Sequence, residues 1–200
     1  MHSSESKVND NKDTDLLLDR IRAGDKRAFE SLVTTYEKSI YRLCYRFFSN
    51  EQDAMDATQE VFLKVYRALE RFEGRSSFKT WIYRIAANTC ITLAEKHKKD
   101  KEGLLQSIIH WWNGRDQETP EEEILEKEQQ KISRQMVRNK IAALPENYRI
   151  PVILKDIEGL SLERIAEILE VPQGTVKSRL NRGRRLLHES LQAQLNRSEG

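Results

Sequence analysis

Apolar residues recur at helical spacing along most of the chain, and no segment alternates in the manner of a strand. Three stretches in the first half follow this period, at about 15–48, 51–71 and 77–96. Their predicted buried faces are Phe29, Leu32, Val33, Tyr36, Ile40, Leu43 and Phe47 in the first stretch, Ala54, Thr58, Val61, Val65 and Leu69, with Phe62 and Tyr66 beside them, in the second, and Phe78, Ile82, Ile85, Ala86 and Thr89 in the third. The first half is therefore predicted to be one helical bundle.

The helical pattern breaks at about 96–120, where charged residues, glycines and Pro120 accumulate around an apolar island at 104–112. It resumes from Glu121 and is interrupted at Pro145 and Gly159, which predicts a second domain of about four helices. The expected fold class is all-α, with two small helical domains joined by a flexible linker. The expected boundaries are a disordered N-terminus at 1–14, a first domain at 15–97, a linker at 98–120 and a second domain at 121–195. Trp111 and Trp112 in the linker fit a partner contact and a local cluster equally well.

The second domain contains the pattern of a helix-turn-helix. Ser161 is a candidate N-cap for a short helix, whose apolar residues are Leu162, Ile165, Ala166 and Leu169. A tight turn is expected at 171–174. The helix after it has Val176, Leu180, Gly183 and Leu187 on its inward face.

The outward face of this last helix is polar and basic. At about 100° per residue, five side chains point away from the core, namely Lys177, Ser178, Asn181, Arg182 and Arg185. Arg179 and Arg184 flank them. Such donors suit base edges and phosphates, so the pattern favours duplex DNA binding over a merely solvated basic helix.

Composition separates two charged regions that the net charge of +2 conceals. Residues 171–188 carry five Lys or Arg and no acid, whereas 116–128 is acidic, which indicates a polyanion-binding module beside an acidic connector. No apolar run reaches the length of a membrane span and the N-terminus is polar, so neither secretion nor membrane insertion is expected. Cys44 and Cys90 are expected to be reduced core residues of a cytoplasmic protein.

The helix at 51–71 has an acidic outer side. Asp53, Asp56 and Glu60 lie there together with apolar Leu63, as on a surface that docks a basic partner protein. Taken alone, the acids are better explained by an ordinary solvated face. Without neighbouring His or Cys, the three carboxylates make a poor metal site.

The loop at 72–77 and the helix after it combine aromatic, cationic and amide side chains. Trp81, Arg84 and Asn88 share a face at spacings i, i+3 and i+7, and Phe72 and Arg75 precede them. Aromatic rings stack on unpaired bases and an amide reads a base edge, which favours single-stranded nucleic acid. Taken alone, these residues are better explained if Trp81 and Tyr83 complete the core.

Taken in order, four segments resemble the extracytoplasmic-function group of bacterial sigma factors in the sigma-70 family, the promoter-recognition subunits of RNA polymerase. The segments are 53–62, 72–89, Leu144-Pro145-Glu146 and 159–187. The resemblance implies a polymerase-binding surface of Asp53, Asp56, Gln59, Glu60 and Leu63, a minus-10 surface of Phe72, Arg75, Trp81, Arg84 and Asn88, and a minus-35 surface of Thr175, Lys177, Ser178, Arg179, Asn181, Arg182, Arg184 and Arg185. It also implies that the acidic linker runs through the polymerase toward the RNA exit path.

The same resemblance implies the partners. They are core RNA polymerase, through its β′ clamp helices and β subunit, promoter DNA in duplex and single-stranded form, and an anti-sigma factor that in the family is often membrane-bound. No enzymatic activity, cofactor, metal or small-molecule substrate is expected. The main alternative is a dimeric helix-turn-helix repressor or activator, which would leave the aromatic loop and the acidic helix without a role. The sequence has neither a Walker loop nor a zinc motif, which argues against an enzyme acting on nucleic acid. A pure adaptor protein would not explain the basic helix.

Overall fold

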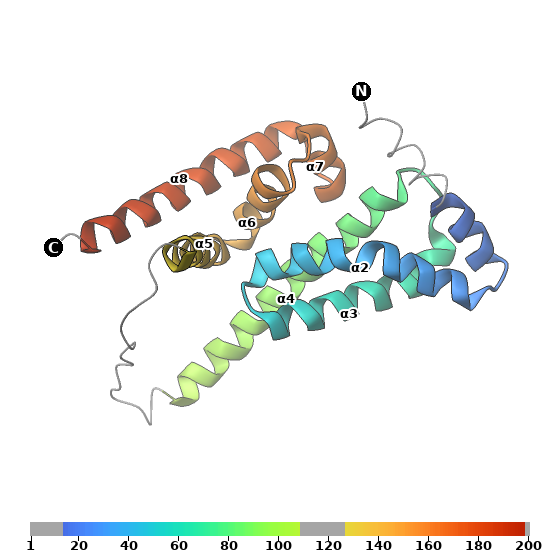
Figure 1. Cartoon of the computed structure of the whole chain (residues 1–200), viewed down its shortest axis with the longest axis horizontal. Helices are drawn as coiled ribbons and strands as arrows, with labels where there is room; N and C mark the ends of the chain where they lie inside the picture. The colour runs from blue at the N-terminus through green and yellow to red at the C-terminus, as the bar shows by residue number, and fades with distance from the viewer. Residues whose placement is uncertain (1–13, 109–126, 199–200) are drawn as a thin grey trace.

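The computed structural model describes residues 14–108 and 127–198, and every regular element in these ranges is a helix, as predicted (Figure 1). After a helix at residues 14–22, the elements of the first unit are α2 (Lys26–Phe48), α3 (Glu51–Ala68), the 3₁₀ turn η1 (Leu69–Arg71) and α4 (Phe78–Ile108). The elements of the second unit are α5 (Lys127–Ala142), α6 (Glu146–Val152), the π-helical turn η2 (Ile153–Ile157), α7 (Leu162–Leu169) and α8 (Gln173–Ser198).

The first unit packs α2, α3 and α4 around the predicted apolar faces. Leu32, Ile40 and Phe47 of α2 are fully buried, and so are Val61 and Val65 of α3. The α4 face is buried as well, except that Ile85 lies at its margin. The 3.6-residue period located this core because each helix presents one apolar side to its neighbours.

The first predicted stretch is in fact two helices. Gly24 adopts a left-handed φ of 89°, and the Asp25 carboxylate accepts hydrogen bonds from the backbone N–H groups of Arg27 and Ala28. The Asp25 N-cap starts α2 at Lys26. The turn at Gly24 interrupts the single helix that was expected from residue 15.

The helix expected to end near Lys96 continues as α4 to Ile108. Leu104 and its apolar neighbours up to Ile108 therefore belong to a helix. Trp111, Trp112 and most of the acidic stretch lie outside the described residues, and the domain boundaries remain a prediction.

The second unit is built on the predicted helix-turn-helix. Ser161 caps α7, its hydroxyl accepting the Arg164 backbone N–H at 3.2 Å. The turn differs from the expectation, because α8 already begins at Gln173 and Glu170 supplies the reversal with a left-handed φ of 53°. Pro172 cannot donate a backbone hydrogen bond, which suits its place just before α8.

The two units pack against each other, α4 against α7 and α2 against α5 (Figure 1). A buried cation, Arg149 of α6, joins them. It donates through Nε and Nη2 to the Leu144 carbonyl at 3.0 and 2.7 Å, and through Nη1 to the Phe47 carbonyl of α2 at 3.2 Å. Its guanidinium also lies 4.5 Å from the centre of the Phe47 ring.

Both cysteines lie in the core of the first unit, as predicted. The Cys44 and Cys90 sulfurs are 3.7 Å apart and neither is in a disulfide. Across the described ranges, no helix combines the length and apolar character needed to cross a membrane.

Gly183 lets α8 approach α6 closely. A Cβ atom added at this position would lie 2.9 Å from Val152 Cγ2 and 3.2 Å from the Tyr148 backbone oxygen. The second contact is with backbone, so the neighbour cannot yield by rotating a side chain. The packing of α8 against α6 therefore requires a residue without a side chain at position 183.

We expect Gly183→Ala to lower the free energy of unfolding by up to about 2 kcal/mol, because overpacking costs about 1–3 kcal/mol and the gain in helix propensity returns about 1 kcal/mol. Urea denaturation followed by circular dichroism measures the change. Gly174→Ala is the matched control on the same helix, since nothing lies within 4 Å of its added Cβ. It should be neutral or stabilising, and an equal loss in both variants would contradict the packing argument.

Candidate nucleic-acid interface

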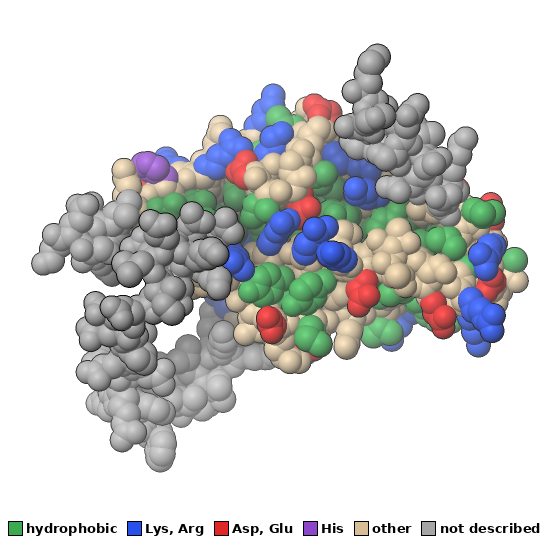
Figure 2. Space-filling model, viewed as in Figure 1, with side chains coloured by type: hydrophobic (Ala, Val, Ile, Leu, Met, Phe, Trp, Pro, Cys, Tyr) green, Lys and Arg blue, Asp and Glu red, His purple; other side chains and the backbone are tan. Residues whose placement is uncertain are grey.

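The predicted outward face of α8 is solvent-exposed. Lys177, Ser178, Asn181, Arg182 and Arg185 are all exposed, while Val176, Leu180 and Gly183 are buried. In Figure 2, Lys and Arg side chains gather along the upper part of the molecule, where α7 and α8 lie in Figure 1. The burial of one side of α8 thus sets a row of hydrogen-bonding groups at the surface.

Three residues predicted for this face have partners within the protein. Arg184 donates to the Asp156 carboxylate of η2 through Nε at 3.0 Å and through Nη2, and this contact raises the pKa of Arg184. Arg185 lies 3.7 Å from Glu189, and the Ser178 hydroxyl donates to the Thr175 carbonyl at 2.9 Å. Arg184 thereby links α8 to η2 in addition to facing solvent.

A second polar site lies where α4 begins. A pocket of about 280 Å³ brings together four of the five residues predicted for single-stranded nucleic acid. Its lining residues are Arg71, Phe72, Glu73, Arg75, Ser76, Trp81 and Arg84. Asn88, the fifth predicted residue, is exposed further along α4 and does not line the pocket.

Aromatic rings form one wall of this pocket. The Phe72 ring packs against Phe78 and Trp81, with centroids 5.6 and 5.0 Å away. Phe72 is only 7% exposed, whereas Trp81 is half-buried and offers part of its ring to the pocket. Phe72 therefore supports Trp81 and belongs to the core as much as to the site.

Sequence reasoning missed Arg71, Glu73 and Ser76 in the pocket. Glu73 and Ser76 lie within the loop at 72–77 and Arg71 directly precedes it, so their place beside Phe72 and Arg75 was the available signal. With Arg75 and Arg84, Arg71 gives the pocket three guanidinium groups, of which that of Arg75 pairs with Glu73 at 2.6 Å.

The acidic face of α3 is also at the surface. Asp56 and Gln59 are exposed, and Leu63 is 49% exposed. Asp53 lies 3.8 Å from His97 and Glu60 lies 3.6 Å from Lys64. The Lys64 cation thus moderates the charge of this face at Glu60, and the His97 ring lies beside Asp53.

Two further apolar side chains extend the α3 face. Met55 is 50% and Tyr66 is 58% exposed, and with Leu63 they follow one side of the helix. Tyr66, predicted to lie beside the buried stripe, packs its ring edge-on against Phe29, with centroids 5.1 Å apart. Exposed apolar residues among polar ones are typical of a protein-binding surface.

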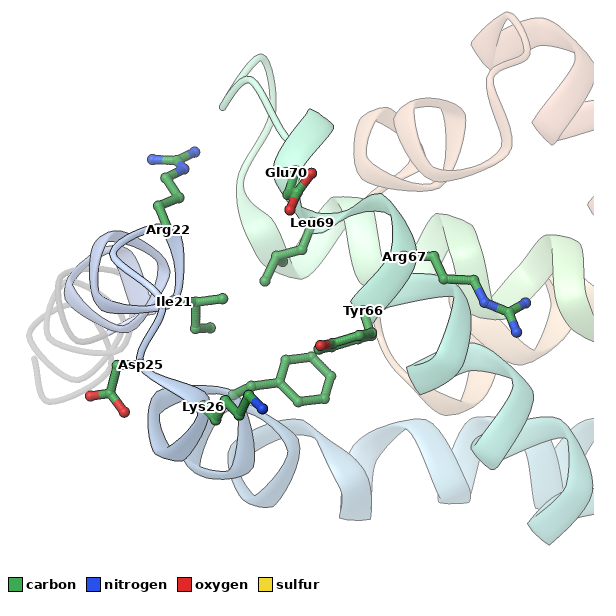
Figure 3. Close-up of a pocket in the computed structure, with 10 residues that line it drawn as sticks. Ile21, Arg22, Asp25, Lys26, Tyr66, Arg67, Leu69 and Glu70 are labelled. Carbon is green, nitrogen blue, oxygen red and sulfur yellow. The ribbon is translucent and has the colours of Figure 1, made fainter.

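Tyr66 also lines a hollow of about 370 Å³ between the helix at 14–22, α2 and the end of α3. In Figure 3 the side chains of Ile21, Tyr66 and Leu69 point toward the space, while Arg22 and Arg67 point away from it. This hollow adjoins the α3 face. Among the described residues, no three His, Cys, Asp or Glu side chains form a group that could hold a metal ion.

Comparison with protein families matches both units. The sigma-70 region 2 model matches residues 32–100, and the sigma-70 region 4 model matches residues 134–187. The first match contains the α3 face and the pocket, and the second contains the helix-turn-helix.

Relatives extend the similarity over most of the chain. The ECF RNA polymerase sigma-E factor of Haemophilus influenzae is 38% identical over 182 residues, which covers 88% of this chain and 94% of that protein. The RNA polymerase sigma-H factor of Pseudomonas aeruginosa is also 38% identical, over 88% of this chain and 92% of its own length.

A solved structure shares the fold. The sigma factor RpoE of Bartonella quintana, crystallised with the anti-sigma factor NepR, superposes with a TM-score of 0.58 at 22% identity, covering 82% of this chain and 96% of that one.

Proposed function

Because the chain belongs to the extracytoplasmic-function sigma factors of the sigma-70 family, we propose that its three surfaces divide the work of transcription initiation. As a member of this family it is a DNA-binding initiation factor and not an enzyme. The α3 face binds core RNA polymerase, α8 binds the minus-35 element and the pocket at the start of α4 captures the minus-10 strand.

The pocket is the observation that carries this proposal. A helix-turn-helix alone also fits a repressor or activator, whereas the pocket adds a half-buried Trp81 beside Arg71, Arg75 and Arg84. An aromatic face with several cations is suited to an unstacked base and its phosphates. It gives the first unit a DNA-binding role of its own, which a simple duplex-binding regulator does not need.

The mechanism requires no covalent chemistry. Contacts from α8 to the duplex fix the register of the protein on the promoter. Capture of an unpaired base then favours the melted state, because a site that binds only the unstacked base shifts the equilibrium toward it. Unstacking costs a few kcal/mol, which the pocket and the polymerase contacts share.

The α3 face is proposed to bind the clamp helices of the polymerase β′ subunit. Its acids and amide, Asp53, Asp56, Gln59 and Glu60, surround Leu63, so charge steers a basic partner and the leucine is buried on contact. Met55 and Tyr66 extend the apolar part of this contact. The family role also supports a location with the polymerase in the bacterial cytoplasm.

We further propose regulation by a cognate anti-sigma factor. The similar sigma factor RpoE was solved bound to one, NepR. An inhibitor of this kind would compete for the polymerase-binding surfaces.

The function is tested by transcription with purified bacterial core polymerase and this protein on a library of fragments from the source genome. We expect new discrete start sites that require the protein, with shared sequences at about the minus-35 and minus-10 positions. Tight duplex binding by the protein alone, with no new start sites, would instead identify a helix-turn-helix regulator.

Leu63→Asp tests the polymerase surface. We expect at least about tenfold weaker binding to core polymerase, measured by fluorescence anisotropy, because a charge replaces the apolar centre of the contact. Leu16→Asp is the matched control, as Leu16 is 62% exposed outside the α3 face. Equal binding of both variants and the wild type would remove Leu63 from the interface.

Arg182→Ala tests the minus-35 surface. Promoter-specific transcription should fall about tenfold, as for loss of one base contact, with core polymerase binding unchanged. Lys38→Ala removes an exposed cation from α2 and serves as the charge control. A loss of polymerase binding in Arg182→Ala would contradict the assigned role.

A further inference from the structure

The helix at 14–22 packs on the first unit, close to the pocket at the start of α4. The sigma-70 region 2 model matches residues 32–100, so this helix lies before the matched part. Its Leu18 side chain is buried in the core, and Leu17 and Ile21 pack against that core. The helix is therefore fixed to the first unit by apolar contacts along one side.

Arg22, in the last turn of this helix, reaches the loop that carries Phe72. Its Nη2 donates to the Phe72 backbone carbonyl at 2.8 Å, and its Nη1 donates to the Asp19 carboxylate at 3.2 Å. In Figure 3 the Arg22 side chain points away from the hollow that Ile21 and Leu69 line. A cation that Asp19 orients thus holds the backbone of the loop from a separate helix.

The other end of the helix contacts the same aromatic rings. The Thr14 and Tyr36 hydroxyls are 3.1 Å apart and hydrogen-bonded, and both residues are buried. The Tyr36 ring packs edge-on against Phe78, with centroids 5.3 Å apart. Phe78 in turn lies 5.6 Å from Phe72 and 5.5 Å from Trp81, between ring centroids. Both ends of the helix therefore support the aromatic wall of the pocket.

The loop at 72–77 is held at its two ends. At the far end, the Ser77 hydroxyl accepts a backbone N–H from the first turn of α4 at 3.2 Å. Within the loop, Arg75 pairs with Glu73, a contact that ties the loop to itself. At the near end, the contact from Arg22 to the Phe72 carbonyl joins the loop to another element. Because the Phe72 ring lies against Trp81, a shift of this near end would move the wall of the pocket.

We propose that the helix at 14–22 is part of the single-strand site and that Arg22 is a positioning residue for the minus-10 strand. The inference rests on the proposed function, because it takes the pocket as the site that captures this strand. Arg22 holds the Phe72 carbonyl, Phe72 supports Trp81, and the Trp81 ring is fixed before an unstacked base arrives. A ring that is already in place binds the base without a further loss of conformational entropy.

Arg22→Ala is the first test, made with holoenzyme assembled from core polymerase and the full-length protein. Two labelled single-stranded oligodeoxynucleotides are the probes. One carries the minus-10 sequence of a promoter that depends on this protein, and the other has the same bases in scrambled order. We expect the ratio of the two affinities, measured by fluorescence anisotropy, to fall about three- to tenfold, a part of the stacking contribution of one base. Binding to core polymerase and to minus-35 duplex should be unchanged.

Two variants control for the charge of Arg22. Arg22→Lys keeps the charge and a donor for the Phe72 carbonyl, so it should retain most of the affinity ratio. Arg27→Ala removes an equal charge from an exposed position at the start of α2 and should behave as the wild type. Loss of the ratio in Arg27→Ala to the same extent as in Arg22→Ala would overturn the proposal.

The salt dependence distinguishes positioning from a direct phosphate contact, since the Arg22 side chain is 48% exposed. Loss of one phosphate contact reduces the slope of log affinity against log salt concentration by about 0.7 for a single strand. We expect the slope to be the same for Arg22→Ala and the wild type. A reduced slope, with equal losses for both oligonucleotides, would overturn the positioning role.

A double-mutant cycle with Trp81→Ala completes the test. Trp81→Ala should itself lower the affinity ratio, and Arg22→Ala should add nothing in that background, because Arg22 acts through the ring that is gone. Thr14→Val removes the hydroxyl contact to Tyr36 and should lower the ratio in the same direction, which keeps the test available if Arg22→Ala does not fold. An unchanged ratio in Arg22→Ala and Thr14→Val, or a loss that persists without Trp81, would overturn the inference. An unchanged ratio in Trp81→Ala would instead contradict the proposed function of the pocket.

Discussion

The Arg149 guanidinium is the contact on which the joined arrangement of the two helical units depends. A buried charge is costly unless it is fully paired, and burial lowers the pKa of Arg149 without removing its proton. Its partners are the Phe47 carbonyl in the last turn of α2 and the Leu144 carbonyl just after α5. Carbonyls at helix C-termini lack intrahelical donors and carry partial negative charge, so one cation satisfies the end of α2 and, at the same time, a carbonyl in the turn that follows α5.

Because this contact joins the two units, some surfaces lie between the units and others face solvent. With α6 fixed to the end of α2, α7 lies along α4 and brings its charged residues to Ser77 and Arg84. The side of α8 that is proposed to bind the duplex and the outer side of α3 face solvent instead. A single arrangement of helices therefore determines which of the three surfaces is occupied within the chain and which are available to partners.

Sequence reasoning succeeded where local periodicity decides the outcome. The helices α3 and α8 each have one apolar and one polar side, so the pattern of residue types was enough to assign most of their buried and exposed positions. The end of α4, the left-handed Glu170 and the exposed ring of Tyr66 could not be assigned in this way, because tertiary contacts override local preference there. The pairing of Arg84 with Glu170 joins positions far apart in the chain and follows only from how the units dock. Asn88 shares a helical face with Trp81 and Arg84 but lies outside the pocket, because one face of α4 extends beyond it, and its role stays a prediction.

The close packing of α8 on α6 at Gly183 also has a consequence for how the DNA sequence preference of such a protein could change. The close approach of the Tyr148 backbone at Gly183 limits the rotation of α8 about its own axis, so a buried position determines which residues of α8 face solvent. Under the proposed function, exchanges at Lys177, Asn181 or Arg182 would change which bases are recognised while the position of the helix stays the same. The preferred DNA sequence could thus change through single surface substitutions on α8. Gly183 would keep the orientation of the helix the same in each variant.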